Sequence, residues 1–357
     1  MKVYITYTQN NHRIAEFNNL QEFRNIFQHL KKTQPVTVRK TLYTKYDQSR
    51  FNNQTKLDFF DGMLRNHLRR YPSDKKMEHF NVFQIPKKSG GYRTITAPDD
   101  MLKAEYTVVK EYLENHLKMK HHQNAFAYTK KTSTLDAITQ HKNNNSKWFL
   151  KIDIKDFFDT CSPELITRQL RKIAPFNLNI QIPHMLAEFA TIDNKLPQGT
   201  PLSPIITNLI MIPFDHHFSE WCNAHGFIYT RYADDILISH QDSFEFSKVI
   251  KRMEHLLRKH EYPFEINTKK TRYGSRNGRN WNLGLMLNKD NKITLGHEYK
   301  NQCKVILHKL KNEELPKEDP HLMGLFSYLK QIEPTYYNGL NSYAIRKHGK
   351  SIKDLLK

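Results

Sequence analysis

Apolar residues recur at helical spacing most clearly between residues 246 and 257. Their intervals of three and four residues predict an amphipathic helix that ends before Pro263. Less regular patterns predict further helices near residues 20–31, 55–70, 297–312 and 320–331. The chain is therefore expected to be rich in helices that each have one apolar face.

Short apolar segments bounded by turn residues predict β-strands elsewhere. Val82–Pro86 and Tyr92–Thr96 lie on either side of Ser89-Gly90-Gly91, so they predict a hairpin. A second hairpin is expected around Asn288–Asn291, and a short strand at Val3–Tyr7. After the hairpin at residues 82–96 we expect a helical segment to about residue 119, and then a loop that leads to Trp148.

The segment Trp148–Asp153 predicts a strand whose two faces differ. Alternation places Leu150 and Ile152 on one face, and it places Lys151 and Asp153 on the other. The carboxylate of Asp153 can therefore leave the core-facing side and lie at the end of the strand.

The composition predicts a globular and strongly basic protein. Its 357 residues allow two or three domains that share a core. An excess of 56 Lys and Arg over 36 Asp and Glu gives a net charge of +20, which indicates a polyanionic partner. No apolar stretch approaches the roughly 18 residues that span a bilayer, and the N-terminus lacks the apolar region of a signal peptide. We therefore expect a cytoplasmic protein that binds nucleic acid and not a membrane.

Candidate chemistry begins with the adjacent carboxylates Asp234 and Asp235. They lie between two β-prone apolar segments, so we expect the pair to occupy the tight turn of a hairpin, where an ion can reach it. An ordinary acidic turn is the alternative. A second acidic cluster, Asp153 to Asp159, also follows a strand and favours a metal site. Phosphoryl transfer by two magnesium ions about 3.5–4 Å apart requires such converging carboxylates.

Three segments together resemble the motifs of a known polymerase family. Tyr232-Ala233-Asp234-Asp235 resembles motif C of reverse transcriptases, and Lys151–Phe158 resembles their motif A. Leu196–Pro204 is similar to the loop and helix start of motif B in bacterial members. The three occur in the order that the family has, and the resemblance covers about residues 80–345.

The resemblance implies which residues form the catalytic centre. Asp153 and Asp234 are expected to bind both Mg²⁺ ions, Asp235 to assist, and the main-chain carbonyl of Ile154 to contribute a ligand. In the segment similar to motif D, Asn267 to Thr271, Lys270 is expected to protonate the leaving pyrophosphate, with a surface lysine as the alternative.

The resemblance also implies nucleotide-binding residues in three segments. They are Asp156, Phe157 and Phe158 after the motif A strand, Gln198 and Gly199 in the motif B loop, and Lys87 and Arg93 on the basic hairpin. Phe158 matches the steric gate, a ring that would collide with a ribose 2′-hydroxyl; a core position is its alternative. Gly199 would let the backbone approach the nascent base pair. Arg93 and one of the two lysines, Lys87 or Lys88, would clamp the triphosphate, with a solvated hairpin as the alternative.

Beyond the catalytic centre, the resemblance implies contacts with primer and template. Leu283 and Gly284 look like the primer grip. The lysines of the helix expected at 297–312 fall near one face and would follow a phosphate backbone, with a solvated face as the alternative. These lysines are Lys300, Lys304 and Lys309.

The fold that the resemblance implies is α+β, a right-hand polymerase with fingers, a palm made of an antiparallel sheet plus helices, and a helical thumb. We expect an N-terminal extension or fingers at 1–80, fingers at 81–150 and a thumb at 288–357. The palm is expected at 151–287, with a fingers insertion at about 162–200.

The function that follows is RNA-directed DNA synthesis from dNTPs, with RNA template and DNA product as partners. The short chain resembles bacterial retron and phage-defence enzymes that copy a dedicated non-coding RNA. Retrons usually carry Asn-Ala-x-x-His before motif A and Val-Thr-Gly at the start of the thumb, and Asp136–His141 and Asn282–Gly284 differ from both. This favours a defence-associated enzyme, with a retron enzyme second. An effector protein or an oligomer is left open.

Other classes of protein fit the sequence less well. A metal-dependent nuclease also uses clustered aspartates, but it does not need Phe158 or the Gln198-Gly199 loop. A non-catalytic nucleic-acid-binding protein has no reason to keep like charges together without a metal. An RNA-dependent RNA polymerase is closer in mechanism, and nucleotide preference distinguishes it.

Overall fold

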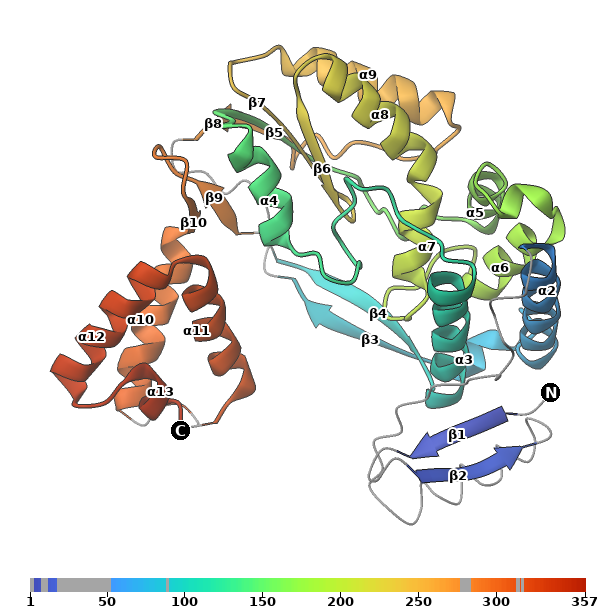
Figure 1. The fold of residues 1–357 in the computed structure, drawn as a ribbon, viewed down its shortest axis with the longest axis horizontal. Helices are drawn as coiled ribbons and strands as arrows, with labels where there is room; N and C mark the ends of the chain where they lie inside the picture. Colours follow the sequence, from blue (N-terminus) through green and yellow to red (C-terminus); the bar gives the residue numbers. More distant parts are fainter. Residues whose placement is uncertain are drawn as a thin grey trace. The chain divides into compact units, whose positions relative to one another are not determined.

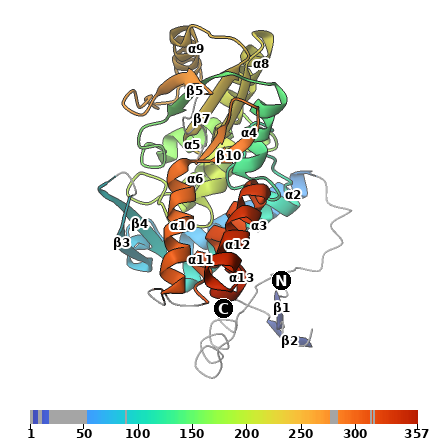
Figure 2. The same cartoon turned by 90° about the vertical axis from the view of Figure 1, so that its left-hand side faces the viewer.

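The computed structural model describes residues 3–7, 12–17, 53–87, 90–276, 284–312, 315 and 318–357 (Figures 1 and 2). The chain forms two compact units, Met1–Lys120 with Cys161–Ile206 and His121–Thr160 with Thr207–Lys357. The helix expected near residues 20–31 lies outside the described residues. None of the described helices is long and apolar enough to cross a bilayer.

The first unit contains the two N-terminal hairpins. β1 (Val3–Tyr7) pairs with β2 (His12–Phe17), and β3 (Phe80–Pro86) pairs with β4 (Tyr92–Pro98). The strands expected from alternation at Val3, Val82 and Tyr92 are confirmed.

Four of the described helices form the core of the first unit. They are α2 (Asn53–Arg70), α3 (Asp100–Glu111), α5 (Pro163–Leu170) and α6 (Gln181–Ala190). α2 and α5 both pack on α6. Phe60, Phe176 and Phe189 are fully buried, and Lys76 is buried beside them. The ammonium of Lys76 donates to the carbonyls of Glu188 and Thr191, at 2.6 and 2.8 Å, so it caps the end of α6.

The loop after α6 is fixed against the β3–β4 hairpin. The main-chain N–H of Thr96 donates to the carbonyl of Gln198 at 2.7 Å. Gly199 has a φ of +125°, and a Cβ added there would lie 2.9 Å from Cγ2 of Ile95 and 3.0 Å from the carbonyl oxygen of Thr96. Glycine is therefore required both by the backbone conformation and by the close approach.

The second unit is built on a four-stranded antiparallel sheet in the order β6-β7-β5-β8. The strands are β5 (Trp148–Asp153), β6 (Ile228–Tyr232), β7 (Asp235–His240) and β8 (Arg272–Ser275). Ile236 to Ser239 on β7 are all buried, so both faces of the sheet are covered. The strand expected at Trp148–Asp153 is confirmed with the bounds predicted.

Helices from four places in the sequence cover this sheet or lead to it. They are α4 (Thr134–Asn143), α7 (Ser203–Ile210), α8 (Ile212–Ala224) and α9 (Phe246–Lys259). α9 confirms the amphipathic helix expected from the apolar pattern. α4 contradicts the loop expected between residue 119 and Trp148. Its inward stripe includes His141, which is fully buried, so the helix does not show a continuous apolar pattern.

His141 joins α4 to the two strands that carry motif C. Its Nδ1 lies 2.6 Å from Oγ of Ser239 on β7, and its Nε2 lies 2.9 Å from Oγ1 of Thr230 on β6. Burial lowers the pKa of His141 to about 3, so the ring is neutral at physiological pH.

The C-terminal part of the second unit is a hairpin followed by helices. The elements are β9 (Leu285–Leu287), β10 (Ile293–Leu295), α10 (His297–Lys311), α11 (Pro320–Ile332), α12 (Pro334–His348) and α13 (Ile352–Leu355). These elements share one apolar cluster with Phe149 and Leu237 of the sheet. α10, α11 and the hairpin confirm the pattern, whereas α12 was not expected.

A buried ion pair braces the β6–β7 hairpin. The guanidinium of Arg231 on β6 binds both carboxylate oxygens of Asp215 on α8, at 2.8 and 2.6 Å. It also donates to Oδ1 of Asn208 at 3.3 Å and to the carbonyl of Ala233 at 3.2 Å. Both charged side chains are fully excluded from solvent, so each depends on the other for compensation of its charge.

Substitution of Gly199 should separate the effect of crowding from that of helix propensity. We expect Gly199→Ala to lower the free energy of unfolding by about 1–3 kcal/mol, because the added Cβ meets Ile95 and Thr96. Gly62→Ala, within α2 and in open space, should raise it by about 0.5–1 kcal/mol. Urea unfolding followed by circular dichroism measures both changes, and equal effects would contradict the close approach.

Removal of one partner of the buried ion pair should be costly. We expect Asp215→Ala to lower the free energy of unfolding by about 3–5 kcal/mol, because Arg231 is then left buried and unpaired. Lys248→Ala breaks an exposed pair with Glu245 and should change it by less than about 0.5 kcal/mol. The urea midpoints of the two variants measure the difference. Similar midpoints would contradict the prediction and show that Arg231 reaches solvent in Asp215→Ala.

Candidate active site

Two neighbouring strands bring Asp153 and Asp235 together. β5 pairs antiparallel with β7, and Asp153 lies directly opposite Asp235 in this register. Residues directly opposite in an antiparallel pair project from the same face, with Cβ atoms about 4.5–5.5 Å apart. The sheet thus brings motif A beside motif C, as the sequence required.

The turn between β6 and β7 holds Asp234 but not Asp235. Tyr232 pairs with Asp235, so Ala233 and Asp234 form the turn and Asp235 begins β7. The expectation that both aspartates occupy the turn is wrong for Asp235, because the strand pairing extends one residue further. Ala233 has a φ of +57°, as two-residue hairpin turns require. The N–H of Ile154 donates to the carbonyl of Asp234 at 3.1 Å, which ties this turn to the end of β5.

Two lysines compensate the charge of these aspartates. Nζ of Lys151 lies 3.0 Å from Oδ1 of Asp235, and Nζ of Lys270 lies 3.1 Å from Oδ2 of Asp153. The side-chain amide of Asn267 donates to the other oxygen of Asp153 at 3.0 Å. Lys270 therefore contacts Asp153, and its expected role toward the pyrophosphate stays a prediction.

The pKa of the Asp234 carboxyl is raised to about 6. Partial burial is the main cause, and the negative charges of Asp235 and Asp153 add to it, while Lys270 opposes it. A carboxyl group in this position gains from a nearby cation, because the cation removes the repulsion that raises the pKa.

The residues present fit a divalent cation in kind. Carboxylate oxygens are the ligands that Mg²⁺ prefers, and Asp153, Asp234 and Asp235 supply them at one end of the sheet. Among the described residues, however, no three His, Cys, Asp or Glu side chains are gathered closely enough to hold a metal ion. Two of the three carboxylates are instead engaged with Lys151 and Lys270, so binding a cation requires their rotation.

Sequence reasoning missed two residues that contact the aspartates. Lys151 lies two residues before Asp153 on the same strand face, so alternation alone could have placed it at the site. Asn267 lies within the segment similar to motif D, where only a lysine was expected to act. Arg231 carried no signal, because its partner Asp215 is known only from the fold.

The segment after β5 places Phe157 and Phe158 differently. Phe157 is buried and packs on Phe264 with ring centroids 5.0 Å apart. Phe158 is only partly buried, and its ring meets those of Phe157 and Tyr128 edge to face. Asp156 is exposed and has a φ of +46°.

Four of the expected nucleotide-binding residues belong to the first unit. Arg93 lies on β4, and Lys87 follows β3. The main-chain N–H of Lys87 donates to the carbonyl of Gly91, and its own carbonyl accepts from the N–H of Gly90, which closes the hairpin. Gln198 and Gly199 form the loop that is fixed to Thr96. Lys87, Arg93 and Gln198 are thus held by one hairpin and the loop bonded to it.

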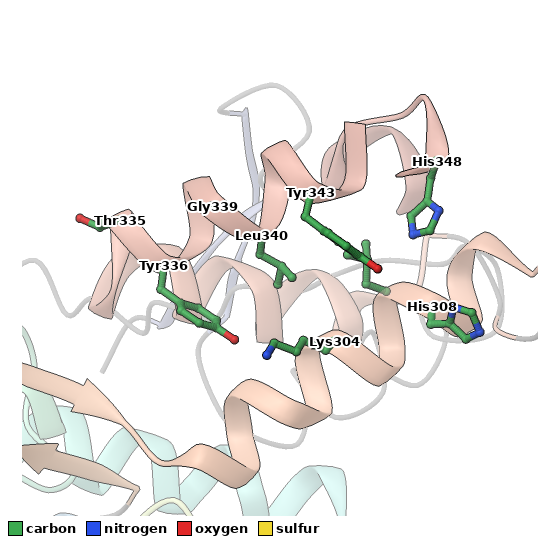
Figure 3. A pocket seen from close by; sticks show the side chains of 9 residues that line it. Lys304, His308, Thr335, Tyr336, Gly339, Leu340, Tyr343 and His348 are labelled. Atoms are coloured by element: carbon green, nitrogen blue, oxygen red, sulfur yellow. The ribbon is translucent and has the colours of Figure 1, made fainter. Parts of the chain in front are cut away.

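The predicted primer and template contacts lie in the C-terminal part of the second unit. Gly284 has a φ of +92°, and Leu283 lies outside the described residues. Lys300 pairs with Glu333, which lies between α11 and α12, at 2.8 Å, and its side chain is mostly buried. Lys309 is exposed. Lys304 lines a pocket of about 600 Å³ between α10 and α12 and points toward Tyr336 (Figure 3).

Comparison with protein families and curated proteins gives matches along most of the chain. The family model of reverse transcriptase (RNA-dependent DNA polymerase) matches residues 85–307. The chain is 30% identical over 289 residues to the Retron Ec83 reverse transcriptase of Escherichia coli, covering 78% of this chain and 90% of that protein. It is 30% identical to the Retron Ec73 reverse transcriptase of the same species, covering 76% and 87%.

Solved structures give a weaker match. Apo telomerase from Candida tropicalis, truncated from the C-terminal domain, has a TM-score of 0.45 and 13% identity, and the match covers 67% of this chain and 60% of that chain.

The family model covers more than half of the chain, and the aspartates that carry motifs A and C lie side by side on the sheet. The chain therefore belongs to the reverse transcriptase family and is an RNA-directed DNA polymerase of the α+β, right-hand type.

Proposed function

We propose that Asp153, Asp234 and Asp235 hold the two Mg²⁺ ions with which this polymerase extends a primer. The observation that carries the proposal is the β5–β7 register, which sets Asp153 opposite Asp235 and next to the turn that holds Asp234. Bound there, the two ions would activate the primer 3′-hydroxyl and neutralise the leaving pyrophosphate. The carbonyl of Ile154 is the proposed main-chain ligand.

Lys270 acts at the same site in this proposal. Asp153 must release the ammonium of Lys270, now 3.1 Å away, before it can bind a cation. The released ammonium stays next to the reacting phosphates, where it is positioned to protonate the pyrophosphate. Lys151 is in the corresponding position beside Asp235, 3.0 Å from its Oδ1.

The remaining residues are proposed to bind the nucleotide and the primer. Phe158 excludes a ribose 2′-hydroxyl with its partly exposed ring, beside Asp156 and the buried Phe157. The residues of the first unit, Lys87, Arg93, Gln198 and Gly199, bind the triphosphate and the nascent base pair. Leu283 and Gly284 grip the primer, and Lys304 and Lys309 contact the nucleic acid backbone.

We also propose that the template is a dedicated non-coding RNA and that the product is the msDNA of a retron. The relatives in E. coli are retron reverse transcriptases, which favours the retron alternative over another defence-associated enzyme. An anti-phage role stays a prediction. Sequencing the nucleic acid that co-purifies with the protein tests this proposal: one repeated RNA-linked DNA species supports it, and heterogeneous cDNA contradicts it.

Primer extension should separate the metal ligands from other acidic residues. On an RNA template with Mg²⁺ and dNTPs, we expect Asp234→Asn to reduce extension to about one thousandth or less, because a metal ligand is lost. Asp290→Asn removes the same charge from an exposed turn of the same unit and should leave extension unchanged. Extension with NTPs in place of dNTPs should be much slower.

An Asp234→Asn variant that keeps full activity would contradict the metal site. If the wild type extends no primer on a generic template, the reaction is repeated on the co-purified RNA, and failure there with folded protein contradicts the proposal as well.

The raised pKa of Asp234 predicts a pH dependence. The pKa of Asp234 in the folded protein, about 6, lies above the ordinary 3.8, so between these pH values the metal-free folded protein binds this proton more tightly than the unfolded chain does. The free energy of unfolding of the metal-free protein therefore falls as the pH rises from about 3.8 to 6. Metal binding needs the ionised form. We therefore expect kcat/KM to rise with pH through an acid limb near pH 6, and higher Mg²⁺ should move this limb to lower pH. A limb that ignores the Mg²⁺ concentration would contradict the assignment.

A further inference from the structure

We propose that Tyr128 is a specificity-determining residue, which fixes the ring of Phe158 and thereby sets the discrimination between deoxynucleotides and ribonucleotides. This rests on the proposed role of Phe158 as steric gate. Tyr128 lies between Phe126 and α4, outside the segments that resemble motifs A to D.

The ring of Phe158 is held edge to face by two aromatic rings. The ring of Phe157 lies 5.8 Å from it at 79°, and the ring of Tyr128 lies 6.5 Å from it at 76°. Both arrangements are favourable for aromatic pairs. Phe157 is anchored in the core by Phe264, so it fixes Phe158 from the protein interior. Tyr128 is 47% exposed and contacts the same ring from the solvent side.

The backbone of Tyr128 is held in an unfavourable conformation. Its φ is +61°, a region that bulky side chains rarely adopt and that costs about 1–3 kcal/mol. Core burial does not account for this conformation, because nearly half of the side chain is exposed. What the conformation does achieve is a Tyr128 ring set against the ring of Phe158.

The residues on either side of Tyr128 are fixed by hydrogen bonds. The side-chain amide of Asn208 donates to the carbonyl of Ala127 at 2.8 Å in the buried interior. The N–H of Phe126 donates to the carbonyl of Arg231 at 2.8 Å, and the hydroxyl of Thr129 donates to the carbonyl of Phe126 at 3.2 Å. These hydrogen bonds fix the chain on both sides of Tyr128 and so oppose relaxation of its φ.

The same support reaches the aspartate turn. Arg231 donates both to Asn208, which holds Ala127, and to the carbonyl of Ala233, which precedes Asp234. The guanidinium of Arg231 thus supports both the segment that holds Tyr128 and the turn that holds Asp234. This arrangement keeps the ring of Phe158 in a fixed position relative to the metal-binding end of the sheet. Residues of a catalytic site must be placed within about 0.5 Å of the productive geometry.

The experiment measures kcat/KM for one dNTP and for the matching NTP in single-nucleotide extension. Tyr128→Asn removes the ring but supplies a residue that tolerates positive φ, so the backbone should be preserved. We expect it to lower the dNTP/NTP ratio about three- to tenfold, the effect of one edge-to-face contact, mainly through a lower KM for the NTP. Tyr128→Phe keeps the ring and should keep the ratio.

Two further variants give the comparison. Phe158→Ala should lower the ratio by about 100-fold, and Tyr128→Asn added to it should lower it no further, because Tyr128 acts through Phe158. Tyr343→Ala removes a similar edge-to-face contact, with His348 at 6.0 Å, from a tyrosine that is 45% exposed, and should leave the ratio unchanged. Thermal unfolding of each variant confirms that it is folded.

The outcomes separate the two proposals. If Phe158→Ala leaves the ratio unchanged, the gate fails and the role of Tyr128 fails with it. If Phe158→Ala lowers the ratio but folded Tyr128→Asn does not, only the role of Tyr128 is overturned. The role of Tyr128 is also overturned if Tyr128→Asn lowers the dNTP/NTP ratio as much in the Phe158→Ala background as in the wild type. A lowered ratio in Tyr128→Phe overturns it as well.

Discussion

The pairing of β5 with β7 places like charges side by side, and the rest of the site depends on how that repulsion is compensated. Asp153 lies opposite Asp235, and Asp234 follows in the adjoining turn. Lys151 and Lys270 each pair with one carboxylate, while the third, Asp234, has a pKa raised to about 6. Such a group of carboxylates is destabilising by itself, and the two lysines offset the repulsion only in part. Divalent cations would offset it further, which favours their binding at this site.

A second constraint lies beneath this end of the sheet. Arg231 is fully buried, binds Asp215 through two hydrogen bonds and supports the carbonyl of Ala233. Buried ion pairs add little stability compared with apolar packing, so their value is more often in defining one geometry. Here the geometry defined is that of a tight turn with a left-handed residue, Ala233, next to the aspartate that must meet the ions. The neutral His141 braces the same hairpin from its other face.

The sequence predicted the parts of this site that rest on local patterns. Alternation predicted the strand Trp148–Asp153 and the face that carries Asp153, and helical spacing predicted α9. It did not predict α4, whose buried stripe contains His141, nor the long-range partner of Arg231, because polar residues in a core leave no periodic signal. Nor did it predict that Lys300 pairs with Glu333, which lies between α11 and α12. Contacts of this kind follow from tertiary packing alone.

The placement of the ions at the aspartates can be tested without measuring turnover. Fe²⁺ replaces Mg²⁺ in many such sites and, with ascorbate and peroxide, cleaves the backbone beside the bound ion. We predict cleavage near Asp153 and near Asp234 and Asp235, identified by mass spectrometry, suppressed by excess Mg²⁺ and lost in Asp153→Asn. Cleavage at other positions, or the same pattern in the folded Asp153→Asn variant, would contradict the account.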